Sequence, residues 1–323
     1  MTAEADLLRD TEVIPKTTPA AGFASGEVIQ LADGRAAFVT GLNARVSGDP
    51  AGLKTSGQVT LAKTAALVIL EGGRVYWDRS AGTATPLQAS AGGDFFVGVA
   101  IEDAASAATT VVVDLNVQPK YLVDLQRDAG NTVIVLTAGT PFCYSRGGSL
   151  LMEFSETAEA QKVDWLSEKS VPVTVPMIFE AKFELTAVAD ADVMDFSIGL
   201  ANGTHATDAE TITESAFFHM DGTAADLNID AECDDGTAAE VAITDTTVDL
   251  VLATPIEMWI DARVLTDLKY YVNGVRVLST TAFDIGDATG PLKALAHLEK
   301  TSNDSPGAWM ISHMAIRATD LAS

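Results

Sequence analysis

Short runs of alternating apolar and polar residues, separated by glycine-containing turns, are the feature that most constrains this chain. Residues 58–62 (Gln-Val-Thr-Leu-Ala) alternate as a half-buried strand does. Asp33-Gly34 and Asn273-Gly274 each lie between two apolar runs, which is a strong short-range signal for a β-hairpin. No segment keeps a helical period for long. We therefore predict an all-β fold.

The composition of the sequence changes at Gln118-Pro119, where larger apolar residues and longer alternating runs begin. We predict a small β-barrel-like domain over residues 25–117 and a larger jelly-roll β-sandwich over residues 118–323. Residues 1–24 are predicted to form an extended arm, because Pro15 and Pro19 prevent a long helix. The arm is either a disordered terminus or a tether across a neighbouring subunit, and the tether interpretation rests on two apolar pairs: Leu7, Leu8, Val13 and Ile14.

The stretch Gly73-Arg74-Val75-Tyr76-Trp77-Asp78, followed by a turn of small residues, is the most distinctive pattern in the first domain. With the Asp-Gly-Arg turn and the later Val-Gly-Val-Ala strand, it resembles the small β-domain of capsid decoration (cement) proteins of tailed phages. The resemblance implies binding to the outer surface of the head through the major capsid protein, and a homotrimer. Neighbouring strand residues face opposite ways, so one of Tyr76 and Trp77 is expected in the core and the other at a contact.

The second domain resembles concanavalin/laminin-G-like sandwiches. The residues that carry this resemblance are Trp259-Ile260-Asp261-Ala262-Arg263-Val264, followed by Tyr270-Tyr271-Val272 and the Asn273-Gly274 turn. So many strands imply two packed sheets, because a single sheet would leave apolar side chains in water. The resemblance does not fix an activity. It leaves open an alternative function, a carbohydrate-binding module that mediates adsorption to host or environmental glycans. On a capsid, this domain would project outward.

The net charge excludes some partners. The chain has 45 acidic and 20 basic residues and a formal charge of −25, which repels nucleic-acid phosphates and anionic membranes.

The acidic N-terminus has no apolar signal core, so we expect synthesis in a host cytoplasm without secretory export. Two cysteines, Cys143 and Cys233, do not make a disulfide framework or a cysteine-rich zinc site.

No motif predicts catalysis, a metal or a cofactor. A glycosidase needs two carboxylates between about 5 and 9.5 Å apart. Glu257 and Asp261, like Glu180 and Glu184, lie four residues apart on one strand, or roughly 13 Å. The four histidines lack metal-ligand spacing, and an acidic stretch does not match a calcium loop: Asp221, Asp226, Asp230, Asp234 and Asp235. We therefore predict a structural protein that is not an enzyme.

Overall fold

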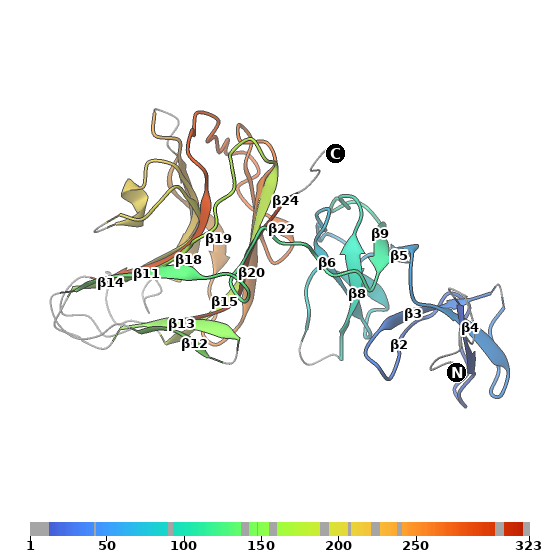
Figure 1. The fold of residues 1–323 in the computed structure, drawn as a ribbon. Helices are drawn as coiled ribbons and strands as arrows, with labels where there is room; N and C mark the ends of the chain where they lie inside the picture. Colours follow the sequence, from blue (N-terminus) through green and yellow to red (C-terminus); the bar gives the residue numbers. More distant parts are fainter. Residues whose placement is uncertain are drawn as a thin grey trace, which may run out of the picture. The chain divides into compact units, whose positions relative to one another are not determined.

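The computed structural model describes residues 13–41, 43–89, 93–136, 142–146, 148–154, 160–187, 194–205, 208–220, 227–237, 241–300 and 307–318. The chain divides into two compact units, Met1–Pro119 (unit 1) and Lys120–Ser323 (unit 2), shown in Figure 1. The predicted all-β fold is confirmed, since the sheets are built from antiparallel strands. In the described ranges, no helix is long and apolar enough to cross a membrane.

Unit 1 begins with a four-stranded antiparallel sheet. Its strands, in spatial order, are β1 (Val13–Thr17), β4 (Pro50–Lys54), β3 (Ala36–Thr40) and β2 (Val28–Gln30). β1 lies within the segment predicted as an arm, where it pairs with β4. Pro15 is compatible with this position because β1 is an edge strand. The predicted Asp33-Gly34 turn joins β2 to β3, and Gly34 has the positive φ of 89° that favours glycine.

A five-stranded antiparallel sheet completes unit 1. In spatial order it consists of β5 (Gln58–Ala62), β9 (Thr110–Leu115), β8 (Phe95–Ala100), β6 (Arg74–Asp78) and β7 (Thr83–Thr85). The side chain of Asn116 links the two sheets. Its Oδ1 accepts a hydrogen bond from the Ala36 amide at 2.9 Å, and its Nδ2 donates to the carbonyls of Ala36 and Thr55. The main core of unit 1 lies on the five-stranded sheet and includes Leu61, Ile69, Val75, Phe95, Val97, Val111 and Val113.

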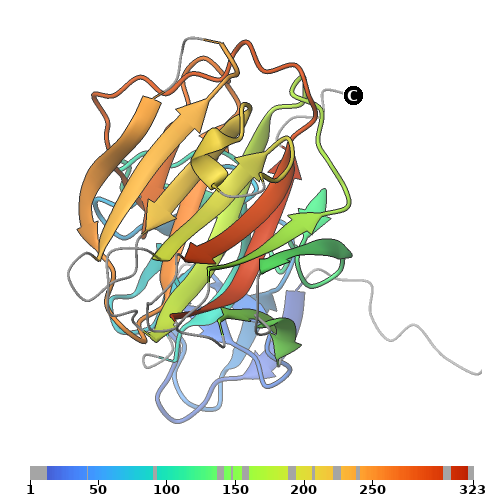
Figure 2. The same cartoon turned by 90° about the vertical axis from the view of Figure 1, so that its left-hand side faces the viewer.

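Unit 2 is a sandwich of two large antiparallel sheets, seen from a second direction in Figure 2. One sheet has seven strands: β11 (Gly130–Leu136), β14 (Gln161–Ser167), β23 (Lys293–Lys300), β16 (Met194–Ala201), β17 (Ser215–Met220), β18 (Asn228–Asp234) and β19 (Val241–Asp249). The other has eight: β12 (Phe142–Arg146), β13 (Ser149–Glu153), β24 (Ala308–Ala318), β15 (Met177–Ala187), β20 (Ile256–Ala262), β21 (Lys269–Val272) and β22 (Val275–Arg276), with β10 (Val123–Asp124) paired to β24. A short 3₁₀ helix, η1 (Ala209–Thr211), precedes β17.

The core of unit 2 lies between these sheets and is rich in aromatic rings. Phe196 stacks on Trp309 with ring centroids 4.2 Å apart, and Phe183 packs against both. The predicted Asn273-Gly274 turn joins β21 to β22. Both of its residues have positive φ, 48° and 77°, as a two-residue type I′ hairpin requires.

Candidate docking groove and polar clusters

A groove in unit 1 lies beside the Tyr-Trp-Asp strand. It encloses about 600 Å³ and is lined by residues 24–30, Trp77, Arg79, Gly82 and Phe95; we call it the Trp77 groove. One wall is the segment leading into and along β2, and the other comes from β6, the turn after it and β8. The groove therefore lies between the two sheets of unit 1.

The turn after β6 is closed by Asp78. Its Oδ1 accepts hydrogen bonds from the amides of Ser80 and Ala81 and from the Ser80 hydroxyl, at 2.7–2.9 Å. These bonds lower the pKa of Asp78, the Ser80 side chain contributing most. Gly82, with φ of 67°, completes the turn by donating to the Asp78 carbonyl. The Trp-Asp pair thus ends a strand and fixes the turn that carries Arg79.

Arg79 is held in the groove by two uncharged partners. Its guanidinium lies over the Phe95 ring, 5.0 Å from the centroid, and its Nη2 donates to Gln30 Oε1 at 3.0 Å. Such stacking orients the planar guanidinium while leaving donors at its edge. Within the described part of the chain, no carboxylate forms an ion pair with Arg79. The groove also contains Glu27, whose Oε2 accepts from the Ala24 amide at 2.7 Å.

The structure separates the candidate contact residues of the first domain. Val75 and Trp77 face the main core of unit 1, and Trp77, at its rim, lines the groove. Tyr76 lies on the other face of β6, buried edge-on against Phe96 with centroids 5.9 Å apart. Val13 and Ile14 lie in β1, where Ile14 packs on a small core that includes Phe23, Val39 and Leu53. Leu7 and Leu8 lie outside the described residues.

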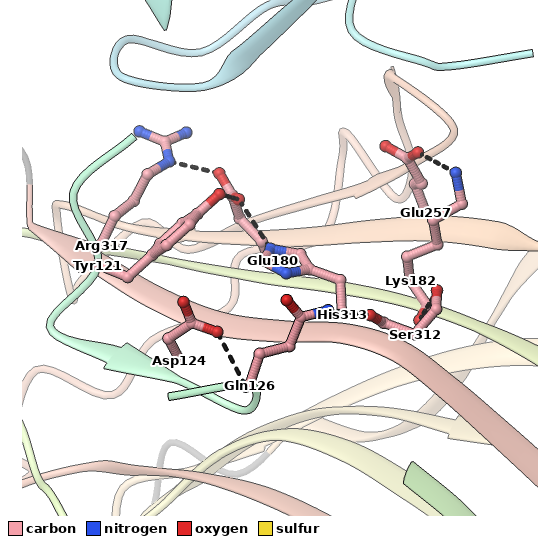
Figure 3. Close-up of polar contacts among 9 residues, drawn as sticks. All are labelled: Tyr121, Asp124, Gln126, Glu180, Lys182, Glu257, Ser312, His313 and Arg317. Carbon is pink, nitrogen blue, oxygen red and sulfur yellow. Dashed lines mark hydrogen bonds and ion pairs between the residues drawn. The ribbon is translucent and has the colours of Figure 1, made fainter. Parts of the chain in front are cut away.

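A connected polar cluster in unit 2 surrounds Glu180 on β15 (Figure 3). Tyr121 donates its hydroxyl to Glu180 Oε2 at 3.1 Å, and His313 Nε2 lies 3.4 Å from the same atom. Arg317 donates from Nε to Oε1. Burial would raise the pKa of Glu180, but the charge of Arg317, with the hydrogen bond and charge of His313, outweighs burial and lowers the pKa to about 2.

These contacts indicate a structural role for Glu180. The carboxylate stays ionised at neutral pH and holds residues from β24 and from the segment that enters unit 2. Nearby, Lys182 Nζ lies 2.8 Å from Glu257 Oε1, and Arg263 Nη2 lies 2.7 Å from Asp261 Oδ2. The four carboxylates tested for glycosidase spacing are Glu180, Glu184, Glu257 and Asp261. Three of them, Glu180, Glu257 and Asp261, each form an ion pair with a lysine or arginine. They are therefore less available to act as a catalytic acid or base.

A second polar cluster crosses the seven-stranded sheet. Strand pairing places Asp164, His297, Ser197 and His219 in consecutive register on β14, β23, β16 and β17. All four are buried. His297 Nδ1 lies 2.6 Å from Asp164 Oδ1, and His219 Nδ1 lies 3.1 Å from Ser197 Oγ. Sequence reasoning missed this row because its members are far apart along the chain.

The described residues include no group of three or more His, Cys, Asp or Glu side chains placed to hold a metal ion. Asp221 and Asp226 of the acidic stretch lie outside the described residues. His313 contacts Glu180 and the Tyr121 ring. Cys143 and Cys233 are free thiols.

The family comparison bears on unit 1. Residues 8–115 match the phage cement protein family. The matched region contains both sheets of unit 1, the Tyr-Trp-Asp strand and the Trp77 groove. It ends before unit 2 begins. The family resemblance predicted from the Tyr-Trp-Asp pattern therefore has independent support for this part of the chain.

Solved structures with some similarity are sandwiches that cover part of this chain. The metal-free carbohydrate recognition domain of Emp46p is 10% identical, with a TM-score of 0.39, and covers 57% of this chain and 87% of its own. A β-1,3-glucanase from Mycobacterium marinum is 8% identical, with a TM-score of 0.40, and covers 61% and 99%. Similarities this weak support no functional inference. No curated protein shows a significant match.

Proposed function

We propose that this protein is a capsid decoration protein that binds the outer surface of a tailed-phage head. In this proposal it stabilises contacts between neighbouring major capsid subunits. The observation that supports it is the match of residues 8–115 to the phage cement protein family. Unit 1 would be the capsid-binding part, and unit 2 would project outward.

The proposed mechanism is burial of surface and bridging, without catalysis. A specific protein contact buries about 1,600 Å² in total. Repetition over a symmetric shell adds avidity without any new contact. The proposed contact residues are Leu7, Leu8, Val13, Ile14, Tyr76 and Trp77. Of these, Trp77 has the strongest structural support because it lines an open groove, whereas Tyr76 is buried against Phe96.

We further propose that the protein acts as a homotrimer on the shell, without nucleic-acid or membrane partners. The charge of −25 supports the exclusion of nucleic acid, because a chain with this net charge is repelled overall by DNA phosphates. The carbohydrate-binding alternative gains no support of its own from the described residues. Two aromatic side chains that could stack on a sugar, Trp259 and Tyr271, are only 8% and 6% exposed.

Binding to purified heads assembled without this protein tests the proposal. The full-length chain, added to such heads, is expected to co-sediment to saturation and to appear as added outer density by electron microscopy. Heads carrying it should withstand heating or chelation better than bare heads. Absence of binding, or density confined to the interior, contradicts the proposal. Sedimentation velocity of the free protein tests the trimer separately.

A further inference from the structure

The outer edge of β2 forms one wall of the Trp77 groove, and its main-chain groups are arranged to accept another strand. β2 is an edge strand of its sheet. Val39 donates its amide to the Glu27 carbonyl and Leu31 donates to the Arg35 carbonyl, while Ile29 is in register with Ala37. Antiparallel bonding alternates along a strand, so Val28 and Gln30 point their amide and carbonyl groups away from β3.

The opposite wall supplies side-chain recognition. Trp77 offers an apolar surface, and Arg79 is fixed by the Phe95 ring and the Gln30 amide with further donors at its edge. In a chain with 45 acidic and 20 basic residues, this arginine is paired with uncharged groups. A guanidinium oriented in this way matches a carboxylate, which it can bind through two parallel hydrogen bonds.

We propose that the Trp77 groove binds an extended segment of a major capsid subunit as an added β-strand along β2. The segment has a carboxylate opposite Arg79 and an apolar side chain against Trp77. Main-chain bonds to Val28 and Gln30 provide affinity, and the two side-chain contacts provide specificity and register. This inference rests on the proposed function, because it names the surface and the chemistry through which unit 1 binds the shell.

The first test reverses the charge at Arg79. The full-length Arg79→Glu variant is expected to bind purified heads at least tenfold more weakly than the unaltered protein. Arg35→Glu is the matched control, since Arg35 is an exposed arginine of the same unit that pairs with Asp33 in the β2–β3 turn. The control should bind within about twofold of the unaltered protein. Thermal unfolding of both variants confirms that each is folded.

A second pair of variants tests the strand edge. Val28→Pro removes an outward amide without removing a β2–β3 hydrogen bond, and is expected to weaken binding tenfold or more. Val28→Ala loses the same packing of the side chain but keeps the amide, so it should bind much more tightly than the proline variant. Equal binding by the two variants would overturn the strand-addition proposal.

A photo-crosslinking side chain in place of Ala24, which lines the groove, identifies the occupant. A cross-link to the major capsid protein, mapped to a segment with an acidic residue, is expected. A cross-link to a second copy of this chain overturns the proposed occupant. If the unaltered protein does not bind heads, the proposed function itself fails. If it binds and all groove variants bind equally well, only the groove inference fails.

Discussion

His297 Nδ1 lies 2.6 Å from Asp164 Oδ1 on the adjacent strand, inside a set of four charged groups of which three are buried. His297 Nε2 lies 3.2 Å from Glu299 Oε2, and Lys162 Nζ lies 3.0 Å from Asp164 Oδ2. Across the sheet, His297 is in register with the neutral Ser197. The two cations balance the two carboxylates only when His297 is protonated.

This arrangement predicts that unit 2 loses stability as the pH rises. Burial lowers the pKa of His297, but hydrogen bonds and charges from Asp164 and Glu299 outweigh burial and raise it above 6.5. A raised pKa gives stability that is fully present below about 6.5 and is lost as the pH passes the folded-state value. His297→Gln should therefore destabilise unit 2 by about 1–3 kcal/mol at pH 6, with a smaller loss at pH 9.

Urea unfolding of the full chain at several pH values measures this difference. His205→Gln, at a half-buried histidine outside the row, is the matched control, and the two variants are compared at each pH. A His297→Gln variant whose stability falls with pH as steeply as that of the unaltered protein would contradict the assignment. Direct titration of the His297 ring by NMR provides an independent check of its pKa.

Glu180 gives the opposite pH dependence. Glu180→Gln takes the carboxylate away from the buried guanidinium of Arg317, and breaking such a pair by removing one partner costs about 3–5 kcal/mol. A lowered pKa gives stability that is present above the ordinary value of 4.5 and is lost as the pH falls toward about 2. The gap between the variant and the unaltered protein should therefore be full at pH 7 and shrink below pH 4.

Denaturant unfolding at pH 7 and pH 3 checks this expectation. Glu184→Gln changes the same chemical group on the same strand at a half-buried site, and should cost less than about 1 kcal/mol at both pH values. A Glu180→Gln variant as stable as this control at pH 7 would show that the cluster in Figure 3 contributes nothing to folding.

Asn116 is predicted to hold the two sheets of unit 1 together. Asn116→Gly removes three side-chain hydrogen bonds but tolerates the positive φ of 59°, and should destabilise unit 1 by about 2–4 kcal/mol. Asn116→Ala loses the same bonds and adds backbone strain, so it should cost about 1 kcal/mol more. Urea unfolding of both variants and the unaltered protein measures these differences in stability. Equal stability of the glycine variant and the unaltered protein would contradict the bridging role.

The sequence predicted those features that depend on neighbouring residues. The Asp33-Gly34 and Asn273-Gly274 turns form as expected, because their conformations are set by two adjacent residues. Alternation along β6 predicted that Tyr76 and Trp77 face opposite sides of the sheet, as they do. This pattern could be predicted because it depends only on the residues of one strand. The pairing of β1, which lies within the predicted arm, with β4 could not be predicted, because it depends on a strand more than thirty residues away.

The polar clusters could not be predicted because they depend on strand order and register. Glu180 was compared with Glu184 on its own strand, yet Tyr121 and Arg317 are 59 and 137 residues away from it. The row through His297 draws on four strands, of which only β16 and β17 follow one another in the sequence. One signal in the groove was available: an arginine directly follows Trp77-Asp78 in a strongly acidic chain.

The Asn273-Gly274 turn tests how far a local signal controls the sandwich. Gly274 has φ of 77°, a conformation that costs a residue with a Cβ about 1–2 kcal/mol, so Gly274→Ala should destabilise unit 2 by that amount. Gly203→Ala is the matched control, because an added Cβ there meets nothing within 4 Å and its φ lies outside the left-handed region. It should change the free energy of unfolding by less than about 0.5 kcal/mol. If both variants unfold at the same urea concentration, the turn does not constrain the β21–β22 hairpin, and the register of this edge depends on the packing of Tyr270 in the core instead.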